Sequence, residues 1–403
     1  MKSLDIIYDP RGILVGRLYC YGRDILFEYD KAFLETGLNL SPFKLKFAVG
    51  VQKSDAEFRH RLHGLFDDSL PDGWGLLLMD KELRKRGIST PPTPLERLAY
   101  IGGAAMGALS YRPSMRDGQC NDLFDIQQVA EESVRLFEGE INDVLPAIAR
   151  AGGSSGGARP KVLVGICDHK MVSGEKGIPD GYEHWIIKFA AKKDLAIAGK
   201  HEFACYLMAK DAGLDMMESR LFHVGDHYFF GTKRFDRMGD QKIHMHTAAN
   251  LVDANFREPA LDYETLCRIT TLLTGNQADV LMMFRIMVFN VAIKNQDDHA
   301  KNFSFLMDDC GVWRLAPAYD LTQSILPSNE HSTSVAGKGC NISRDDMLVV
   351  AKNAGISSSG AREIIEQIYD VTSREHDYMD AAKAHCKQVA TNNFIERKEG
   401  EGK

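Results

Sequence analysis

The sequence predicts an α+β protein in which β-rich segments come first and mostly α-helical segments follow. Before about residue 235, short apolar runs separated by glycine-containing turns are typical of strands. Beyond about residue 247, the pattern is mostly helical, apart from one predicted hairpin. The chain has 403 residues, 44% hydrophobic and 26% charged, which suffices for two to three lobes and excludes a disordered scaffold.

The first part of the chain is predicted to begin with antiparallel strands. The run 13–29 contains two apolar stretches joined by a glycine-containing turn, which predicts a strand pair. A proline, an aspartate and a glycine at 71–73 precede a helical stretch at 74–86. The proline-rich run 91–94 is a candidate boundary, and a further helical segment is expected near 122–150.

The middle of the chain is predicted to continue as a hairpin, a helix and two strands. A glycine-rich turn at 151–161 leads into a hairpin formed by 162–166 and 185–189. Helical spacing follows at 200–212. The two further strands are predicted at 221–224 and 228–233.

The last part is predicted to hold a buried helix and a hairpin. The most apolar run of the chain, 280–293, predicts the helix. The hairpin strands are predicted at 303–306 and 312–315. The charged, glycine-containing tail at 396–403 is expected to be disordered.

Composition and charge exclude several classes of protein. The net charge of −7 argues against a chain that coats a phosphate backbone, so any nucleic-acid contact is expected to be local or borrowed from a partner. The eight cysteines are scattered singly, which predicts buried free thiols in a reducing cytosol. Asp5 and Asp9 argue against a signal peptide, and 280–293 is too short to span a bilayer. We therefore expect a cytoplasmic protein without a membrane segment.

The glycine- and serine-rich loop at 152–161 is the first candidate site. Glycines let backbone N–H groups turn toward an anion, and serine hydroxyls add donors, so such a loop can wrap phosphates. Its sequence does not match the phosphate-loop motif, because Lys161 is not followed by a hydroxyl residue. On this segment alone, a flexible connector is an equal alternative.

Lys188 is the second candidate, because it follows three apolar residues on the predicted strand 185–189. A lysine at this place can contact nucleotide phosphates, with an acid such as Glu202 holding its ammonium group. The alternative is an edge-strand lysine that extends to solvent.

The polar run 295–302 gives the strongest signal in the chain. It places two carboxylates, an imidazole, a lysine and a carboxamide directly after the buried helix. An acid that accepts a hydroxyl proton, five positions before an asparagine that binds Mg²⁺, is the pattern of phosphoryl-transfer enzymes. Asp297 and Asn302 have this spacing; the alternative is a solvated, helix-capping loop. Zinc is not expected, because His299 has no second ligand at suitable spacing.

Asp320 follows the predicted hairpin, whose ends return to one place. Asp320 is therefore expected near Asn302, and the two side chains supply oxygen ligands suited to a hard cation. A turn aspartate without a ligand is the alternative. His244 and His246 also suggest a metal site, but we expect them only to share an exposed face of an extended segment.

These motifs, taken together and in order, resemble the HipA family of bacterial toxin serine/threonine kinases. The region before residue 115 also resembles the N-terminal subdomain of full-length HipA proteins, notably at 16–18 and 65–73. Met115 to Ala149 and the part beyond about residue 360 carry no diagnostic motif. The matching segments are 154–161, 185–189, 201–203, 233–237, 297–304 and 317–320.

The resemblance implies a two-lobed protein-kinase-like fold that transfers the γ-phosphoryl group of ATP to a protein hydroxyl. It makes Asp297 the catalytic base, Asn302 and Asp320 the Mg²⁺ ligands, and Lys188 the contact to the α and β phosphates. Asp298 competes with Asp297 for the base role, and the five-residue spacing to Asn302 favours Asp297. The residues that the resemblance places at the nucleotide, with 233–235 as the hinge, are Gly156, Gly157, Ala158, Arg159, Pro160, Lys161, Lys188, Lys233, Arg234, Phe235, His299, Ala300, Lys301, Asn302, Tyr319 and Asp320.

The resemblance also implies regulation by autophosphorylation. In the family, the kinase phosphorylates a serine three positions before a glycine-alanine pair, and Ser154 holds this place before Gly157 and Ala158. The neighbouring Ser155 leaves the assignment open by one residue. Added negative charge in a phosphate-wrapping loop is expected to repel nucleotide.

The resemblance implies a small helix-turn-helix antitoxin of the HipB type as partner, with operator DNA contacted mainly through it. The expected protein substrate is a translation factor such as an aminoacyl-tRNA synthetase. Two alternatives stay open: a catalytically idle regulatory subunit, and a small-molecule kinase of the aminoglycoside or choline type. The expected divisions are an N-terminal subdomain, the rest of the N-lobe, a helical C-lobe and a tail, at 1–114, 115–235, 236–395 and 396–403.

Overall fold

The computed structural model places most of the chain, and three of the predicted segments fall largely outside it. Most of the predicted helix at 122–150 lies outside the described residues, as do positions 151–158 of the glycine-rich turn and the tail at 396–403. The described residues are 1–59, 61–88, 91–115, 129, 132, 135, 159–168, 170–174, 178–189, 197–224, 227–258 and 261–386.

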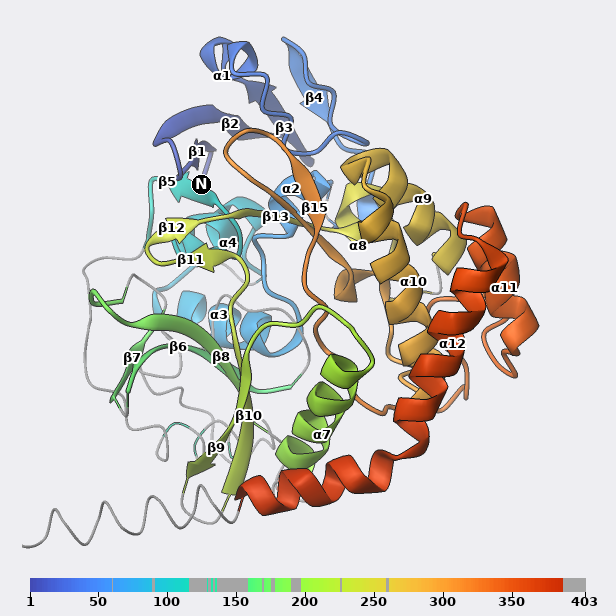
Figure 1. The fold of residues 1–403 in the computed structure, drawn as a ribbon. Coiled ribbons are helices and arrows are strands. Elements are labelled where there is room, and N and C mark those ends of the chain that lie inside the picture. The colour runs from blue at the N-terminus through green and yellow to red at the C-terminus, as the bar shows by residue number, and fades with distance from the viewer. Residues whose placement is uncertain are drawn as a thin grey trace, which may run out of the picture.

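The N-terminal part is an antiparallel sheet with short helices packed beside it (Figure 1). Its strand order is β4-β3-β2-β1-β5, and the predicted strand pair at 13–29 is confirmed as β2 and β3. The strands are β1 (Ser3–Tyr8), β2 (Ile13–Tyr21), β3 (Asp24–Tyr29), β4 (Val51–Lys53) and β5 (Leu109–Arg112). The helices are α1 (Lys31–Glu35), η1 (Glu57–Arg59), α2 (Gly64–Asp67), α3 (Gly73–Lys85) and α4 (Pro94–Ile101).

A second antiparallel sheet follows, with the order β7-β6-β8-β10-β9. The predicted hairpin is confirmed as β6 and β8, and the loop between them contains the additional edge strand β7. Helix α7 (Ala198–Asp211) packs on β10 (Figure 1). The strands are β6 (Lys161–Cys167), β7 (Lys170–Ser173), β8 (Glu183–Lys188), β9 (Ser219–Val224) and β10 (His227–Lys233).

The remainder is mostly helical, as predicted, and is organised around α10 (Gln277–Ala292). Asn276 caps this helix by accepting from the Ala278 N–H at 3.0 Å, and apolar side chains on most of its surface are buried. The other helices are α8 (Ala248–Leu251), α9 (Tyr263–Thr274), η3 (Ala300–Asn302), α11 (Arg344–Asn353) and α12 (Ser358–Ser373). The strands are β11 (Arg237–Met238), β12 (Gln241–Lys242), β13 (His244–Thr247), β14 (Ser304–Met307) and β15 (Trp313–Leu315).

The predicted hairpin at 303–315 is confirmed as β14 and β15, but β13 joins it as a third strand. This corrects the expectation that His244 and His246 share an exposed face, since both are buried. His244 Nε2 lies 2.9 Å from the Leu40 carbonyl oxygen, and His246 contacts Asp68 at 2.5 Å and Ser41 at 3.0 Å. Residues from the N-terminal part therefore cover this strand.

Two further expectations concern membranes and disulfides. Across the described ranges, no helix combines the length and the apolar character needed to cross a bilayer. The cysteines that the structure describes, which are all but Cys120, carry free thiols, as the scattered spacing predicted. Cys205, Cys267 and Cys386 are buried as expected, but Cys20 and Cys310 are exposed.

A buried carboxylate joins the N-terminal part to the segment after β10. Asp236 accepts from the Gly107 N–H at 2.7 Å and forms two hydrogen bonds with Arg234, at 2.8 and 2.7 Å. Arg237 donates to the same carboxylate at 2.8 Å and to the Ala105 carbonyl oxygen at 2.9 Å. Burial alone would raise the pKa of Asp236, but the two guanidinium groups hold it well below its usual range. We call this group of residues the Asp236 clamp.

Removal of the clamp carboxylate is expected to destabilise the protein strongly. Asp236→Ala leaves two arginines buried without their counter-ion, and we expect it to lower the free energy of unfolding by about 3–5 kcal/mol. Urea unfolding at pH 7 measures the loss. The matched control is Glu218→Ala, which removes an exposed pair with Arg220 and is expected to cost at most about 1 kcal/mol. Equal losses in the two variants would contradict the role of the clamp.

Candidate functional site

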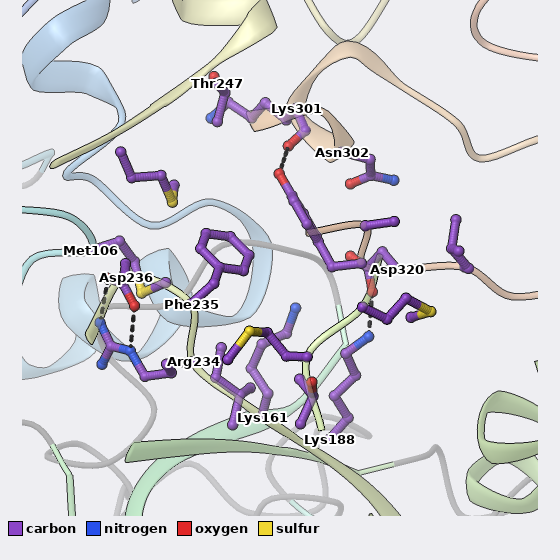
Figure 2. A pocket seen from close by; sticks show the side chains of 18 of the residues that line it. Met106, Lys161, Lys188, Arg234, Phe235, Asp236, Thr247, Lys301, Asn302 and Asp320 are labelled. Atoms are coloured by element: carbon purple, nitrogen blue, oxygen red, sulfur yellow. Dashed lines mark hydrogen bonds and ion pairs between the residues drawn. The ribbon is translucent and has the colours of Figure 1, made fainter. Parts of the chain in front are cut away.

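A cavity lies between the second sheet, the loops around β14 and β15, and the N-terminal part (Figure 2). Side chains from segments far apart in the sequence converge on it, including many of those that the sequence predicted. The predicted residues that line it are Lys161, Lys188, Lys233, Arg234, Phe235, His299, Lys301, Asn302, Tyr319 and Asp320.

Lys188, at the end of β8, lies at the charged end of the cavity. Its ammonium group forms ion pairs with Glu202 of α7 and with Asp320. Lys161 is its partner across the β6–β8 ladder, so two lysines enter the cavity side by side. Burial alone would lower the pKa of Lys188, but the two carboxylates raise it above its usual value. Burial and the charge of Lys188 lower the pKa of Lys161, and the charge of Asp320 partly offsets this lowering.

Asp320 is held in an unusual backbone conformation. Its φ is 55°, in the left-handed region that non-glycine residues seldom adopt, and Asn295 donates to its carbonyl oxygen at 3.2 Å. Burial alone would raise the pKa of its carboxyl group, but Lys188 and Lys161 hold it well below its usual range. Asp320 is therefore a carboxylate at neutral pH.

Asn302 and Asp297 lie at the two ends of the loop that precedes β14. The Asn302 amide donates to the Asp297 carbonyl oxygen at 2.9 Å, which fixes both residues in one turn. The Asp297 side chain is exposed at the surface of the loop. Desolvation by the surrounding protein, together with the charges of Asp320 and Asp298, raises the pKa of Asp297, although His299 opposes this.

Asp298 has a different environment from its neighbour. It is fully buried and accepts from the Tyr263 hydroxyl at 2.7 Å and from the Thr333 N–H at 3.2 Å, and His331 Nδ1 lies 3.0 Å away. These contacts tie the segment after Asp320 to the loop that carries Asp297. A carboxylate with these partners and no exposure cannot receive a proton from an external hydroxyl, whereas the Asp297 side chain is accessible to one.

Aromatic side chains also line the cavity. Phe235 contacts the ring of Tyr319, with ring centroids 5.4 Å apart. The Tyr319 hydroxyl donates to the Lys301 carbonyl oxygen at 2.7 Å and lies 2.6 Å from the Ser304 hydroxyl. The Arg234 guanidinium belongs to the Asp236 clamp, and its backbone N–H donates to the His184 carbonyl oxygen at 2.9 Å.

The remaining residues predicted to contact the nucleotide differ in their exposure and contacts. Arg159 is exposed, Ala300 is buried, and the Pro160 carbonyl oxygen accepts from the Phe189 N–H at 2.8 Å. Lys233 lines the cavity while forming an ion pair with Glu183. Outside the described residues lie Ser154, Ser155, Gly156, Gly157 and Ala158.

The N-terminal part contributes side chains that the sequence reasoning missed. Asp68, Leu70, Asp72 and Met106 all line the cavity. The first three lie in the motif at 65–73, so a signal was present, but nothing in it indicated the site. Lys301 connects the two parts, because its ammonium group lies 3.5 Å from Asp72 and 3.8 Å from Asp67.

The donor set at the charged end fits a hard cation better than a soft one. No group of three or more His, Cys, Asp or Glu residues suited to a metal occurs in the described part of the chain. Asn302 and Asp320 both line the cavity and offer an amide and a carboxylate oxygen. Mg²⁺ takes few protein oxygens and completes its octahedron with phosphate and water, so this pair fits it.

Comparison with known protein families gives two matches that cover most of the chain. A family model described as the HipA N-terminal domain matches residues 5–112. A second model, described as the HipA-like C-terminal domain, matches residues 153–375.

Similarity extends to curated proteins and to a solved structure, over nearly the full length for one of each and over about half the length of another curated relative. The "Putative kinase Y4mE" of Sinorhizobium fredii is 24% identical over 100% of this chain and 98% of its own length. The "Putative kinase Y4dM" of the same organism is 27% identical over 51% of this chain and 56% of its own length. HipA of Shewanella oneidensis MR-1, solved with HipB and operator DNA, has a TM-score of 0.69 at 18% identity, covering 96% of this chain and 97% of that one. The predicted α+β, two-lobed kinase-like fold is thereby confirmed.

The two neighbouring aspartates are expected to differ in their effect on stability. Asp298→Ala leaves several buried donors without an acceptor, and we expect it to lower the free energy of unfolding by about 2–4 kcal/mol. Asp297→Ala removes an exposed carboxylate with a raised pKa and is expected to change it by less than about 0.5 kcal/mol. Urea unfolding of both variants at pH 7 is the measurement. If the Asp297 variant were the less stable one, the assignment of a structural role to Asp298 would be wrong.

Proposed function

Because the chain belongs to the HipA family, we propose that it is a serine/threonine protein kinase that uses ATP. The observation that carries the proposal is the convergence of Lys188, Glu202 and Asp320 at one end of a cavity that Asn302 also lines. Phosphoryl transfer needs cations at the phosphates and a proton acceptor beside the attacking hydroxyl. This cavity has the cations. Asp297 does not itself line it, but its carbonyl oxygen accepts from the Asn302 amide, and Asn302 does line it.

In the proposed reaction, the two lysines bind the phosphates. The ammonium groups of Lys188 and Lys161 neutralise phosphate charge. Glu202 keeps Lys188 oriented when the Asp320 carboxylate binds a metal ion instead of Lys188. Asn302 and Asp320 would hold Mg²⁺, which when bound polarises the phosphate oxygens and orients them for in-line transfer.

Asp297 is proposed to accept the proton of the substrate hydroxyl. Its raised pKa makes it a stronger base than an ordinary aspartate. Its exposure leaves room for a side chain of another protein to approach, unlike the buried Asp298. The hydroxyl oxygen then forms the bond to the γ-phosphorus as the bond to ADP breaks.

We further propose the role of a toxin with a protein substrate in translation, such as an aminoacyl-tRNA synthetase. The solved relative is a HipA held in a complex with HipB and operator DNA. A HipB-like helix-turn-helix antitoxin is the corresponding partner here. The net charge of −7 supports DNA contact mainly through this partner.

The catalytic assignment predicts a large loss of phosphoryl transfer in two variants. Asp297→Asn removes the proton acceptor and Lys188→Met removes a phosphate contact, and each is expected to lower the rate on the order of 10²–10⁴-fold. Transfer of label from [γ-³²P]ATP to a discrete protein band in a cell lysate measures it. The matched control is Asp240→Asn, an exposed aspartate in the turn between β11 and β12, which is expected to retain full activity.

Other outcomes of this experiment point to the alternatives. Label on a small molecule, with none on protein, would indicate a small-molecule kinase. No transfer by the wild type, with growth inhibition retained in Asp297→Asn, would indicate an idle regulatory subunit. In an active wild type, kcat/KM is expected to fall on the acidic side as Asp297 gains a proton, with an apparent pKa above that of an ordinary aspartate.

Autophosphorylation predicts one added phosphate at Ser154. Intact-mass analysis after incubation with Mg-ATP is expected to show it in the wild type and in Ser155→Ala, but not in Ser154→Ala. Asp297→Asn is the control for transfer by the enzyme itself and is expected to remain unmodified. The same added mass in Ser154→Ala, with none in Ser155→Ala, would move the site by one residue.

A further inference from the structure

One wall of the cavity is supplied by a loop of the N-terminal domain. Met106, in the loop between α4 and β5, is half-buried and lines the cavity together with Phe235. Figure 2 shows Met106 and Asp236 on one side of the cavity and Lys188 and Asp320 on the other. Met106 therefore lies across the cavity from Lys188.

The loop that carries Met106 is fixed on both sides of this residue. Asp236 accepts from the Gly107 N–H at 2.7 Å, and Arg237 donates to the carbonyl oxygens of Ala105 at 2.9 Å and Gly107 at 3.1 Å. Lys242 donates to the Gly103 carbonyl oxygen at 2.5 Å. These bonds come from the segment directly after the hinge at 233–235, so the loop and the hinge form one unit.

Close packing also limits where the loop can lie. Gly107 has a φ of +74°, and a Cβ atom at this position would lie 3.1 Å from the backbone nitrogen of Met245 on β13. Only glycine combines this φ with so short a distance to the Met245 backbone without strain. The position of Met106 is thus set by backbone contacts on its C-terminal side and by the Asp236 clamp.

We propose that Met106 contacts the nucleotide base and sets selectivity for it, so that the N-terminal domain completes the nucleotide site. This rests on the proposed function, which places the phosphates at Lys188 and hence the base toward the opposite end. A purine presents flat apolar faces, and a methionine side chain packs on such a surface with little strain. The Asp236 clamp then couples docking of the N-terminal domain to nucleotide affinity.

The first test uses the wild-type chain with ¹³C-labelled methionine methyl groups. Addition of the non-hydrolysable analogue AMP-PNP with Mg²⁺ is expected to shift the Met106 signal saturably, and the signal is assigned by its absence in Met106→Leu. Met217 also lines the cavity, whereas Met238 on β11 is 65% exposed and does not line it. Met217 is therefore the positive control and Met238 the negative one.

The second test changes the size of the side chain. Met106→Ala is expected to weaken ATP binding by about three- to tenfold, because apolar contact area is lost, while Met106→Leu retains it. Met106→Gly is expected to accept ATP with a benzyl group on N6 better than the wild type does, relative to ATP. Met238→Ala is the matched control and is expected to change neither quantity.

The outcomes separate this inference from the function on which it rests. A nucleotide-dependent shift of Met217 without one of Met106, or unchanged affinity and selectivity in the folded Met106 variants, would overturn the inference alone. No shift of any cavity methionine would mean that the nucleotide does not bind there, and the proposed function would fail first. If the glycine variant does not fold, the signal of the wild-type Met106 still decides.

Discussion

The position of Lys188 depends on two carboxylates that come from opposite sides of the cavity. Glu202 lies on α7, packed on the second sheet, and Asp320 follows the hairpin in the helical part. An ammonium group buried beside another lysine would be costly without these partners. The pair of ion pairs therefore joins the two lobes at the place where phosphate charge is proposed to bind.

The N-terminal domain is joined to the same region by further buried polar contacts. The Asp236 carboxylate accepts a hydrogen bond from the Gly107 N–H. The Asp68 carboxylate accepts from the Thr247 N–H at 2.8 Å and contacts the His246 ring. Removal of one partner of such a buried pair lowers the free energy of unfolding more than removal of one partner of an exposed ion pair does, because the remaining group stays desolvated. These contacts make the N-terminal domain part of the cavity wall, and they are the physical basis of the proposed role of Met106.

Much of the candidate site could be predicted because its residues lie close together in short segments of the sequence. Asp297 and Asn302 lie five residues apart, and one hydrogen bond closes the turn between them. Asp320 lines the same cavity as Asn302, as expected from the hairpin, whose strands β14 and β15 pair. The expected exposure of His244 and His246 was wrong, because the residues that cover them are about 200 positions earlier in the chain.

The sequence by itself determined the succession of a β-rich part and a mostly helical part, the motifs at the charged end of the cavity and the family. Local spacing decides these features, since periodicity and turn residues act over a few positions. Only the tertiary structure decided that Asp298 is buried while Asp297 is exposed, and that Asp68, Asp72 and Met106 line the cavity. Burial and contact between distant segments arise from packing of the whole chain, which no local pattern in one sequence specifies.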